Sequence, residues 1–199
     1  MILVLNGSPS GKKGNCHVLI QKLTQKMKCH SDWQKKGAIK IIHLAEYKWS
    51  KETQKSLFAS LDHANGFIFV TGTYWDSWGS PLQRFLENVT ELEGSTTFMG
   101  KPAVVLVLNH SVGGKGVLSR LQGVLSTIGC LIPPMSGFVY SWVSEQVIKN
   151  NSTKETQKDM WSLDDLDIIL ENFKKVLAIK VKWSAWPVDE KDFRKVWLR

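Results

Sequence analysis

Short apolar runs alternate with amphipathic helical patterns along most of this chain, and this alternation restricts the fold more than any other feature. Apolar strands are expected at residues 2–5, 39–43, 67–71, 103–108 and about 131–139. Helices are expected at about 15–29, 51–63, 79–91, 115–129 and 162–182. Nearly continuous apolar strands are typical of a parallel sheet that helices cover on both faces. Right-handed crossovers then predict an α/β, doubly wound, five-stranded sheet of order 2-1-3-4-5.

The first strand runs directly into a loop of glycine and small polar residues, and a helical pattern starts near Asn15. The start of a helix exposes backbone N–H groups, and Ser8 and Ser10 add hydroxyl donors. An anion there meets these donors together with the positive end of the helix dipole. We therefore predict a phosphate-binding loop, with an ordinary strand–helix connection as the alternative. Its candidate binding residues are Ser8, Pro9, Ser10, Lys12, Asn15, Cys16 and His17.

The spacing of this loop argues against two common phosphate sites. A nucleoside-triphosphatase loop needs G-x-x-x-x-G-K-[ST], whereas only three residues separate Gly7 from Gly11, and Lys12 is followed by another lysine. A dinucleotide loop needs G-x-G-x-x-G, which is absent here. The remaining interpretation is a compact loop for one terminal phosphate, as in the FMN sites of flavodoxin-like folds.

Two further strand–loop–helix segments follow, TGTYWDSWGSPLQRFLENV after residue 70 and the Gly-Gly loop of VVLVLNHSVGGKGVLSRLQGVL. Together with the first loop they resemble the NADPH-dependent FMN reductase family, over most of residues 1 to 140. The matching positions are Gly7, Ser8, Asn15, Cys16, Tyr74, Ser77, Pro81, Phe85, Leu86, Gly113 and Gly114. The departures are Gly72 where the family has proline, and Gln83, Glu87 and Asn88 where it has lysine, aspartate and arginine.

The resemblance implies a flavodoxin-like fold that binds FMN, with NADPH or NADH as co-substrate. It places the isoalloxazine ring against the second and third loops, at Gly72, Thr73, Tyr74, Trp75, Asp76, Ser77, Asn109, Ser111, Gly113 and Gly114. In this interpretation a backbone N–H of the turn 73–75 bonds the flavin N5, and N–H groups of 111–114 stabilise negative charge on the reduced ring. FMN carries the chemistry, so no catalytic side chain is expected.

The implied activity is transfer of hydride from NAD(P)H to FMN and then to a small acceptor, such as a quinone, an azo dye, a nitroaromatic or free flavin. Ping-pong kinetics are expected, because donor and acceptor share one flavin face. One alternative is a flavodoxin-like electron-transfer or regulatory protein that holds FMN without NAD(P)H turnover. Another is a degenerate family member that binds no flavin. Candidate contacts for the nucleotide phosphates are Arg84, Lys115 and Arg120.

Composition limits the partners. The 43% hydrophobic and 22% charged residues are ordinary for a globular chain, and no apolar run reaches the roughly 18 residues of a membrane helix. The net charge of +8 accompanies no nucleic-acid-binding motif, so we expect no nucleic-acid partner. Three scattered cysteines predict no metal site. Because the N-terminus lacks a signal-peptide pattern, we expect a cytoplasmic protein.

The chain divides into one predicted FMN-binding domain, residues 1–182, and a Trp-rich extension, residues 183–199. The extension contains Trp183, Trp186 and Trp197 beside acidic and basic residues. We expect these indoles to pack against protein, across the interface of a homodimer or homotetramer or over the chain's own core. The alternative is an anchor to a membrane surface, but we expect no membrane partner because acidic residues interrupt the basic ones. Cys16, near the start of a helix, has the setting for a lowered thiol pKa, but we favour the alternative of a small loop residue that donates to phosphate as serine or threonine would.

Overall fold

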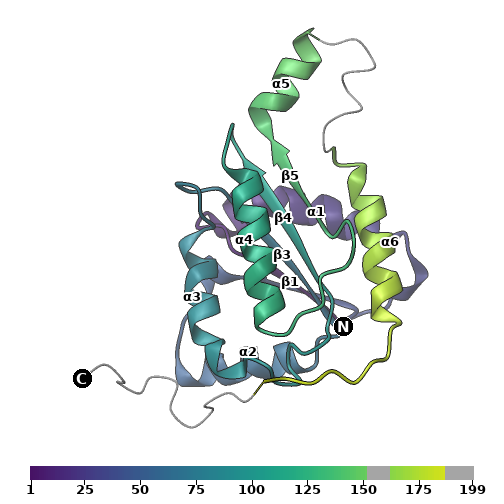
Figure 1. The fold of residues 1–199 in the computed structure, drawn as a ribbon. Helices are drawn as coiled ribbons and strands as arrows, with labels where there is room; N and C mark the ends of the chain where they lie inside the picture. Colours follow the sequence, from purple (N-terminus) through teal and green to yellow (C-terminus); the bar gives the residue numbers. More distant parts are fainter. Residues whose placement is uncertain (152–161, 187–199) are drawn as a thin grey trace.

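The computed structural model describes residues 1–151 and 162–186. All strand pairings in its five-stranded sheet are parallel, and the order is β2-β1-β3-β4-β5 (Figure 1). This confirms the predicted flavodoxin-like, doubly wound arrangement. The strands are β1 (Ile2–Asn6), β2 (Ile39–His43), β3 (Gly66–Gly72), β4 (Ala103–Asn109) and β5 (Gly137–Ser141).

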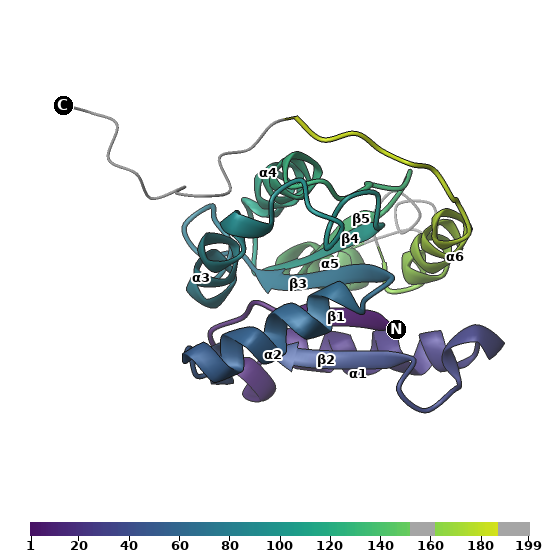
Figure 2. The same cartoon turned by 90° about the horizontal axis from the view of Figure 1, so that it is seen from below.

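Helices lie on both sides of the sheet, as Figure 2 shows. They are α1 (Asn15–Lys28), α2 (Lys51–Asp62), α3 (Ser80–Asn88), α4 (Gly114–Thr127), α5 (Trp142–Asn151) and α6 (Asp165–Leu177). Successive side chains of a strand point to opposite faces, so the fully apolar β1 serves two cores. Leu3 and Leu5 pack with residues of α2, α3 and α4, whereas Ile2 and Val4 pack with residues of α1 and α6. In the described part of the chain, no helix combines the length and apolarity needed to cross a membrane.

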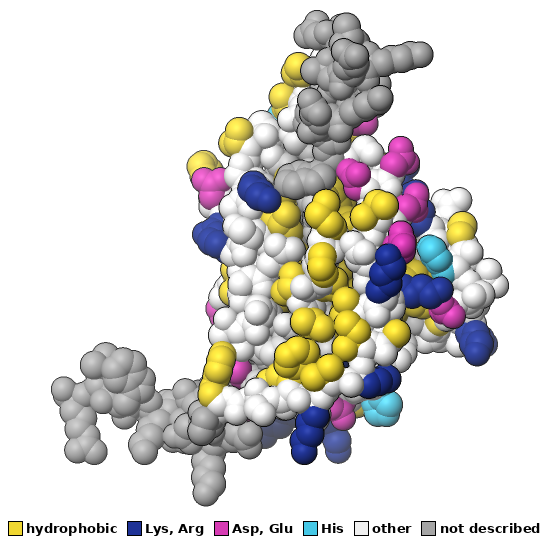
Figure 3. Space-filling model, turned by 45° about the vertical axis from the view of Figure 1, so that its right-hand side comes forward, with side chains coloured by type: hydrophobic (Ala, Val, Ile, Leu, Met, Phe, Trp, Pro, Cys, Tyr) yellow, Lys and Arg dark blue, Asp and Glu magenta, His cyan; other side chains and the backbone are white. Residues whose placement is uncertain are grey.

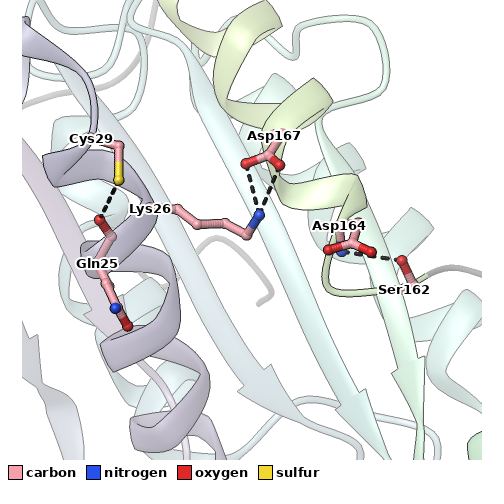
Figure 4. Close-up of polar contacts among 6 residues, drawn as sticks. All are labelled: Gln25, Lys26, Cys29, Ser162, Asp164 and Asp167. Atoms are coloured by element: carbon pink, nitrogen blue, oxygen red, sulfur yellow. Dashed lines mark hydrogen bonds and ion pairs between the residues drawn. The ribbon is translucent and has the colours of Figure 1, made fainter.

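An ion pair also joins α1 to α6 (Figure 4). The Lys26 ammonium lies 2.9 and 2.8 Å from the two carboxylate oxygens of Asp167. The Asp167 side chain is 60% exposed, so water screens the pair and its energy is small. The buried contacts of Ile20, Leu23 and Phe173 therefore hold α1 and α6 on the sheet.

The C-terminal third differs from the prediction in three places. β5 begins at Gly137 instead of near residue 131, because Pro133 and Pro134 lack the N–H groups that a strand ladder needs. The helix α5 follows β5 without a loop and projects beyond the sheet (Figure 1), a helix that the sequence did not predict. The last helix is shorter than expected and ends at Leu177.

After α6 the chain runs without helix or strand to residue 186. Trp183 lies against Gly100, and the Trp186 indole N–H donates to Glu93 Oε1 at 3.1 Å. Within one chain these two indoles remain 46% and 60% exposed, so intramolecular packing buries them only in part. Hydrophobic side chains also gather on the face shown in Figure 3. Trp197 lies outside the described residues, and packing of the extension across subunits stays a prediction.

Candidate cofactor-binding site

The three predicted loops meet at one edge of the sheet, the carboxyl ends of β1, β3 and β4. Gly79, at the end of the second loop, is so close to the first loop that an added Cβ would lie 2.3 Å from the Gly7 carbonyl oxygen and 2.8 Å from Pro9 Cδ. Gly113, in the third loop, is equally close to the Asp76 carboxylate of the second. The three loops that the sequence grouped into one site are therefore neighbours in space.

The first loop ends in a helix start that has backbone donors to offer. Gly14 caps α1 in an extended conformation, and no side chain caps the helix. The N–H groups of Gly14, Asn15 and Cys16 have no acceptor among the described residues. A Cβ on Gly14 would lie 2.7 Å from Ser10 Cβ and 3.5 Å from the Ser8 hydroxyl oxygen. The hydroxyls thus gather around exposed backbone N–H groups, as an anion site requires.

Lys12 holds this loop in place through Glu46. Its backbone N–H donates to one Glu46 carboxylate oxygen at 3.0 Å, and its ammonium lies 2.9 Å from the other. These bonds to Lys12 lower the pKa of the Glu46 carboxyl. The Lys12 side chain is therefore engaged by Glu46, and the donors left for a phosphate are the N–H groups at the start of α1, the serine hydroxyls and the side-chain amide of the exposed Asn15.

The hypothesis of a lowered pKa for the Cys16 thiol is wrong. Burial raises the pKa of the Cys16 thiol to about 12, and a hydrogen bond with Ser8 opposes this only in part. The side chain is 3% exposed and belongs to the core beneath α1. Its neighbour His17 lies beside His43, with 5.1 Å between the ring centroids.

The second loop is a two-residue hairpin turn at its tip. The N–H of Tyr74 donates to the Ser77 carbonyl at 2.8 Å, and the N–H of Ser77 donates back at 2.9 Å. Trp75 and Asp76 between them have φ values of 48° and 56°, which cost roughly 1–3 kcal/mol each for such residues and cluster at functional sites. The Trp75 side chain is fully exposed.

The hairpin leaves few backbone N–H groups for the predicted hydrogen bond to the flavin N5. The Thr73 N–H donates to the Leu108 carbonyl at 2.8 Å, and Tyr74 is used inside the hairpin. Of the turn 73–75, only the Trp75 N–H has no acceptor within the described part of the chain. Behind it, the Thr71 hydroxyl oxygen accepts from the Gly79 N–H at 3.1 Å and fixes the end of the loop.

The third loop, 110–113, also offers backbone donors. The N–H groups of Ser111, Val112 and Gly113 have no acceptor among residues 1–151 and 162–186. Gly113 has a φ of 85°, in the left-handed region that favours glycine. Gly114 starts α4 with no room for a side chain, because a Cβ would lie 2.2 Å from Val139 Cγ1. The unpredicted helix α5 supports the loop through the Val143 N–H, which donates to the His110 carbonyl at 2.8 Å.

Three buried polar atoms without partners belong to the loop, helix and strand end at this edge. Among the described residues, the buried side-chain atoms that lack a hydrogen-bond partner are His17 Nδ1, Thr73 Oγ1, Asn109 Oδ1 and Ser136 Oγ. The first three belong to predicted cofactor-binding residues, one in each segment of the site. Such atoms are costly unless a ligand or water satisfies them. A ligand with a phosphate and a flat polar ring system, as FMN has, fits this set.

Two of the cationic candidates pack over aromatic rings. Arg84 packs over the Trp49 ring at 5.6 Å from its centroid, and Arg120 packs over the Trp78 ring at 6.0 Å. The Trp78 indole N–H donates to Gln83, one of the residues that departs from the family pattern. In the described part of the chain, no three His, Cys, Asp or Glu residues are grouped to hold a metal ion.

Sequence reasoning missed the residues that support the loops from behind, chiefly Asn6, His43, Glu46 and Thr71. Asn6 is fully buried at the end of β1. The sequence feature that could have revealed this role was a polar amide residue at the end of an otherwise apolar strand. Its partners could not be read from the sequence, since they come from another strand and from the loop itself.

The comparisons with known proteins agree with this geometry. The model of the family "NADPH-dependent FMN reductase" matches residues 1–142. Comparison with curated proteins gives no match. The structures of an NADH:FMN oxidoreductase (EMOB, apo form) and of FerB, a flavoenzyme NAD(P)H:(acceptor) oxidoreductase from Paracoccus denitrificans, are similar. For the first the TM-score is 0.62 at 18% identity, covering 84% of this chain and 87% of that one. For FerB the TM-score is 0.58 at 19% identity, covering 87% and 97%.

A third similar structure is general stress protein 14 from Treponema denticola, in complex with FMN. Its TM-score is 0.56 at 9% identity, covering 88% of this chain and 98% of that chain. At such identities the structures support the fold alone. The sheet order together with the family match defines a flavodoxin-like oxidoreductase with FMN as cofactor. By the family match, the chain belongs to the NADPH-dependent FMN reductase family.

Proposed function

We propose that this protein oxidises NADPH or NADH through FMN and reduces small acceptors, with quinones, azo compounds, nitroaromatics and free flavin as the acceptor class. The observation that carries the proposal is the set of partnerless buried atoms of His17, Thr73 and Asn109 at one edge of the sheet. The described chain leaves these atoms without a partner, and a flavin nucleotide bound at this edge would offer them hydrogen-bonding groups.

The first loop would hold the FMN phosphate. The N–H groups at the start of α1 and the hydroxyls of Ser8 and Ser10 are the donors, and the helix dipole adds to the attraction. Bound FMN supplies the redox chemistry, taking a hydride from the nicotinamide and passing electrons to the acceptor. The protein's part is to bind and orient the ring and to stabilise the charge that develops on it.

The second and third loops would hold the ring. The Trp75 N–H is the donor that remains available in its turn, and the N–H groups of Ser111, Val112 and Gly113 provide further donors. The exposed rings of Tyr74 and Trp75 offer a surface for a planar acceptor or for the nicotinamide. Arg84, Lys115 and Arg120 are our candidates for the phosphates of the co-substrate.

The absorption spectrum of the purified protein after incubation with FMN and gel filtration tests cofactor binding. We expect a bound flavin spectrum, followed by quinone-dependent oxidation of NADPH or NADH with parallel initial-rate lines, as ping-pong kinetics require. Bound flavin without turnover would instead favour an electron-transfer or regulatory protein. Absence of bound flavin would favour a member that has lost the cofactor, and intersecting lines would contradict a shared site.

FMN is proposed as the cofactor in preference to FAD, because the first loop offers donors for one terminal phosphate. Calorimetry should therefore give a lower Kd for FMN than for FAD, and equal or tighter FAD binding would contradict the assignment. We also propose a homodimer or homotetramer. Sedimentation velocity at micromolar concentration tests this assembly. A protein that sediments only as a monomer would contradict it.

A further inference from the structure

The amide of Asn6 is fixed in one orientation beneath the first loop. Asn6 is fully buried at the last position of β1. Its Oδ1 accepts from the Ser8 N–H at 3.1 Å, and its Nδ2 donates to the Gly11 carbonyl oxygen at 3.0 Å. Rotating the amide by 180° would set oxygen against oxygen and N–H against N–H. The two backbone contacts therefore determine which end of the amide carries the hydrogens.

The same Nδ2 lies 2.9 Å from the Nδ1 of His43, the residue paired with Asn6 in the β1–β2 register. An amide nitrogen has hydrogens to donate and no lone pair to offer, so His43 Nδ1 has to be the acceptor. The imidazole is then neutral, with its proton on Nε2. If Nδ1 also took a proton, two donors would face each other and this hydrogen bond would be lost.

Several charged or titratable groups surround the His43 ring, and most of them favour this neutral form. Burial lowers the pKa of the His43 imidazole, Glu46 opposes the change, and His17 and Lys12 lower the pKa further. Glu46 comes from the turn after β2, His17 from α1, and Lys12 from the first loop. Much of the Glu46 charge is already engaged by Lys12.

We propose that Asn6 and His43 are positioning residues for the phosphate loop and that the loop holds its ligand only while His43 is neutral. Neutral His43 lets Asn6 hold Ser8 and Gly11, and this sets the direction from which the chain enters α1. When His43 is protonated, the Asn6 amide loses its hydrogen-bond acceptor, and the loop becomes less firmly held. Identifying the ligand as FMN depends on the proposed function, whereas the state of the Asn6–His43 pair does not.

The binding test compares wild type with His43→Gln across about pH 5 to 8. Glutamine keeps a carbonyl acceptor for Asn6 and does not titrate. His63→Gln is the matched control, an exposed histidine that follows α2 at the opposite edge of the sheet. FMN affinity is measured by quenching of flavin fluorescence, with riboflavin, which lacks the phosphate, as the second probe.

We expect wild type and His63→Gln to lose FMN affinity in acid more steeply than His43→Gln. The difference should approach tenfold for each pH unit below the pKa of His43, since one proton is linked to release. The phosphate of FMN titrates in the same range, but it does so equally for all variants. Riboflavin should show no such difference. Identical FMN profiles for wild type and His43→Gln, or tighter wild-type binding in acid, would overturn the proposal.

A second measurement needs no flavin and separates failure of this inference from failure of the proposed function. Nitrogen-15 NMR of the His43 ring should show an unprotonated Nδ1 and a protonated Nε2 at neutral pH. The backbone amide signals of Ser8 and Gly11 should then shift with the titration of His43 in wild type and stay constant in His43→Gln. A proton on Nδ1 at neutral pH would refute the proposal even in a chain that binds FMN. Ser8 and Gly11 signals that do not change as His43 titrates would refute it as well.

Discussion

The hydroxyl oxygens of Ser8 and Tyr74 lie 3.2 Å apart and join the loop after β1 to the loop after β3. Gly72 makes this contact possible, because a Cβ at that position would lie only 3.0–3.2 Å from ring atoms and the hydroxyl oxygen of Tyr74. The glycine that departs from the family's proline thus lets the tyrosine fold back toward the phosphate loop. We expect a ligand that contacts one loop to affect the other through this bond.

Removing the bond with Tyr74→Phe should weaken FMN binding by about 0.5–1.5 kcal/mol, the net contribution of one hydrogen bond. The first loop would lose its tie to the second, while the aromatic ring stays in place. Tyr47→Phe is the control, because the Tyr47 hydroxyl donates to the carbonyl oxygen of Thr53, which belongs to α2. Calorimetric titration with FMN measures both. Equal affinities for the two variants would show that the loops are not coupled.

The phosphate contacts themselves can be tested with the double variant Ser10→Ala, Asn15→Ala. It should weaken FMN binding by about 2–4 kcal/mol, because hydrogen bonds to charged groups contribute roughly 1.5–3 kcal/mol each and solvent offsets part of the loss. Riboflavin affinity should stay the same, since riboflavin has no phosphate. Flavin retained through dialysis as well as in wild type would place the phosphate elsewhere.

Much of the site could be predicted because its parts are local in the sequence. Ile2–Leu5 and Phe67–Val70 are apolar runs that end in glycine-rich loops, and parallel strands bring such loops to one edge. The supports behind the loops could not be predicted this way. Whether Glu46 binds Lys12, or His43 faces Asn6, depends on how segments more than 30 residues apart pack together.

The errors in the C-terminal third have a similar origin. Pro133 and Pro134 interrupt an apolar stretch that looked like one strand, so β5 starts only at Gly137. Helix α5 carries exposed Trp142 and Val147 and shows no apolar stripe of the kind that marks a helix covering a core. Its anchor, the hydrogen bond to His110, is made by the backbone and leaves no trace in the pattern of side chains.

Gly79→Ala should destabilise the protein by about 1–3 kcal/mol, since a methyl group has no space between the Gly7 carbonyl and the Pro9 ring. The first loop has to move, so FMN affinity should fall as well. Gly123→Ala is the matched control. It lies inside α4 with nothing within 4 Å of the added carbon, and should stabilise the helix by roughly 0.5–1 kcal/mol. Urea unfolding measures the free energy of unfolding of both variants. If Gly79→Ala left it unchanged, the first and second loops would be free to move apart.

The buried Cys16 thiol should make the free energy of unfolding depend on pH in the alkaline range. Its pKa is raised from 9.0 to about 12, so the folded state favours the protonated thiol. The stabilisation that comes from this thiol is fully present below pH 9. It is lost as the pH rises further, because the Cys16 thiol then ionises only in the unfolded chain. The free energy of unfolding of wild type relative to Cys16→Ala should fall by about 1.4 kcal/mol per pH unit above that point. A difference that does not change with pH would show an accessible thiol.

Truncation after Lys182 tests whether the Trp-rich extension contributes to stability. The truncation removes Trp183 from its contact with Gly100 and Trp186 from its hydrogen bond with Glu93. Each indole is roughly half-buried, so the two together bury on the order of 150–250 Å², or about 4–6 kcal/mol of apolar burial before the cost of ordering the chain.

We therefore expect the melting temperature of the truncated protein to drop by several degrees, as a net loss of about 1–2 kcal/mol implies for a chain of this size. Trp186→Phe, which keeps the chain length and most of the apolar area, should lose only a fraction of that. If the half-exposed indoles complete their burial across a subunit interface, sedimentation velocity should also show the truncated protein shifted toward monomer, with FMN bound less tightly. An unchanged melting temperature together with an unchanged sedimentation coefficient per protomer would contradict both roles for the extension.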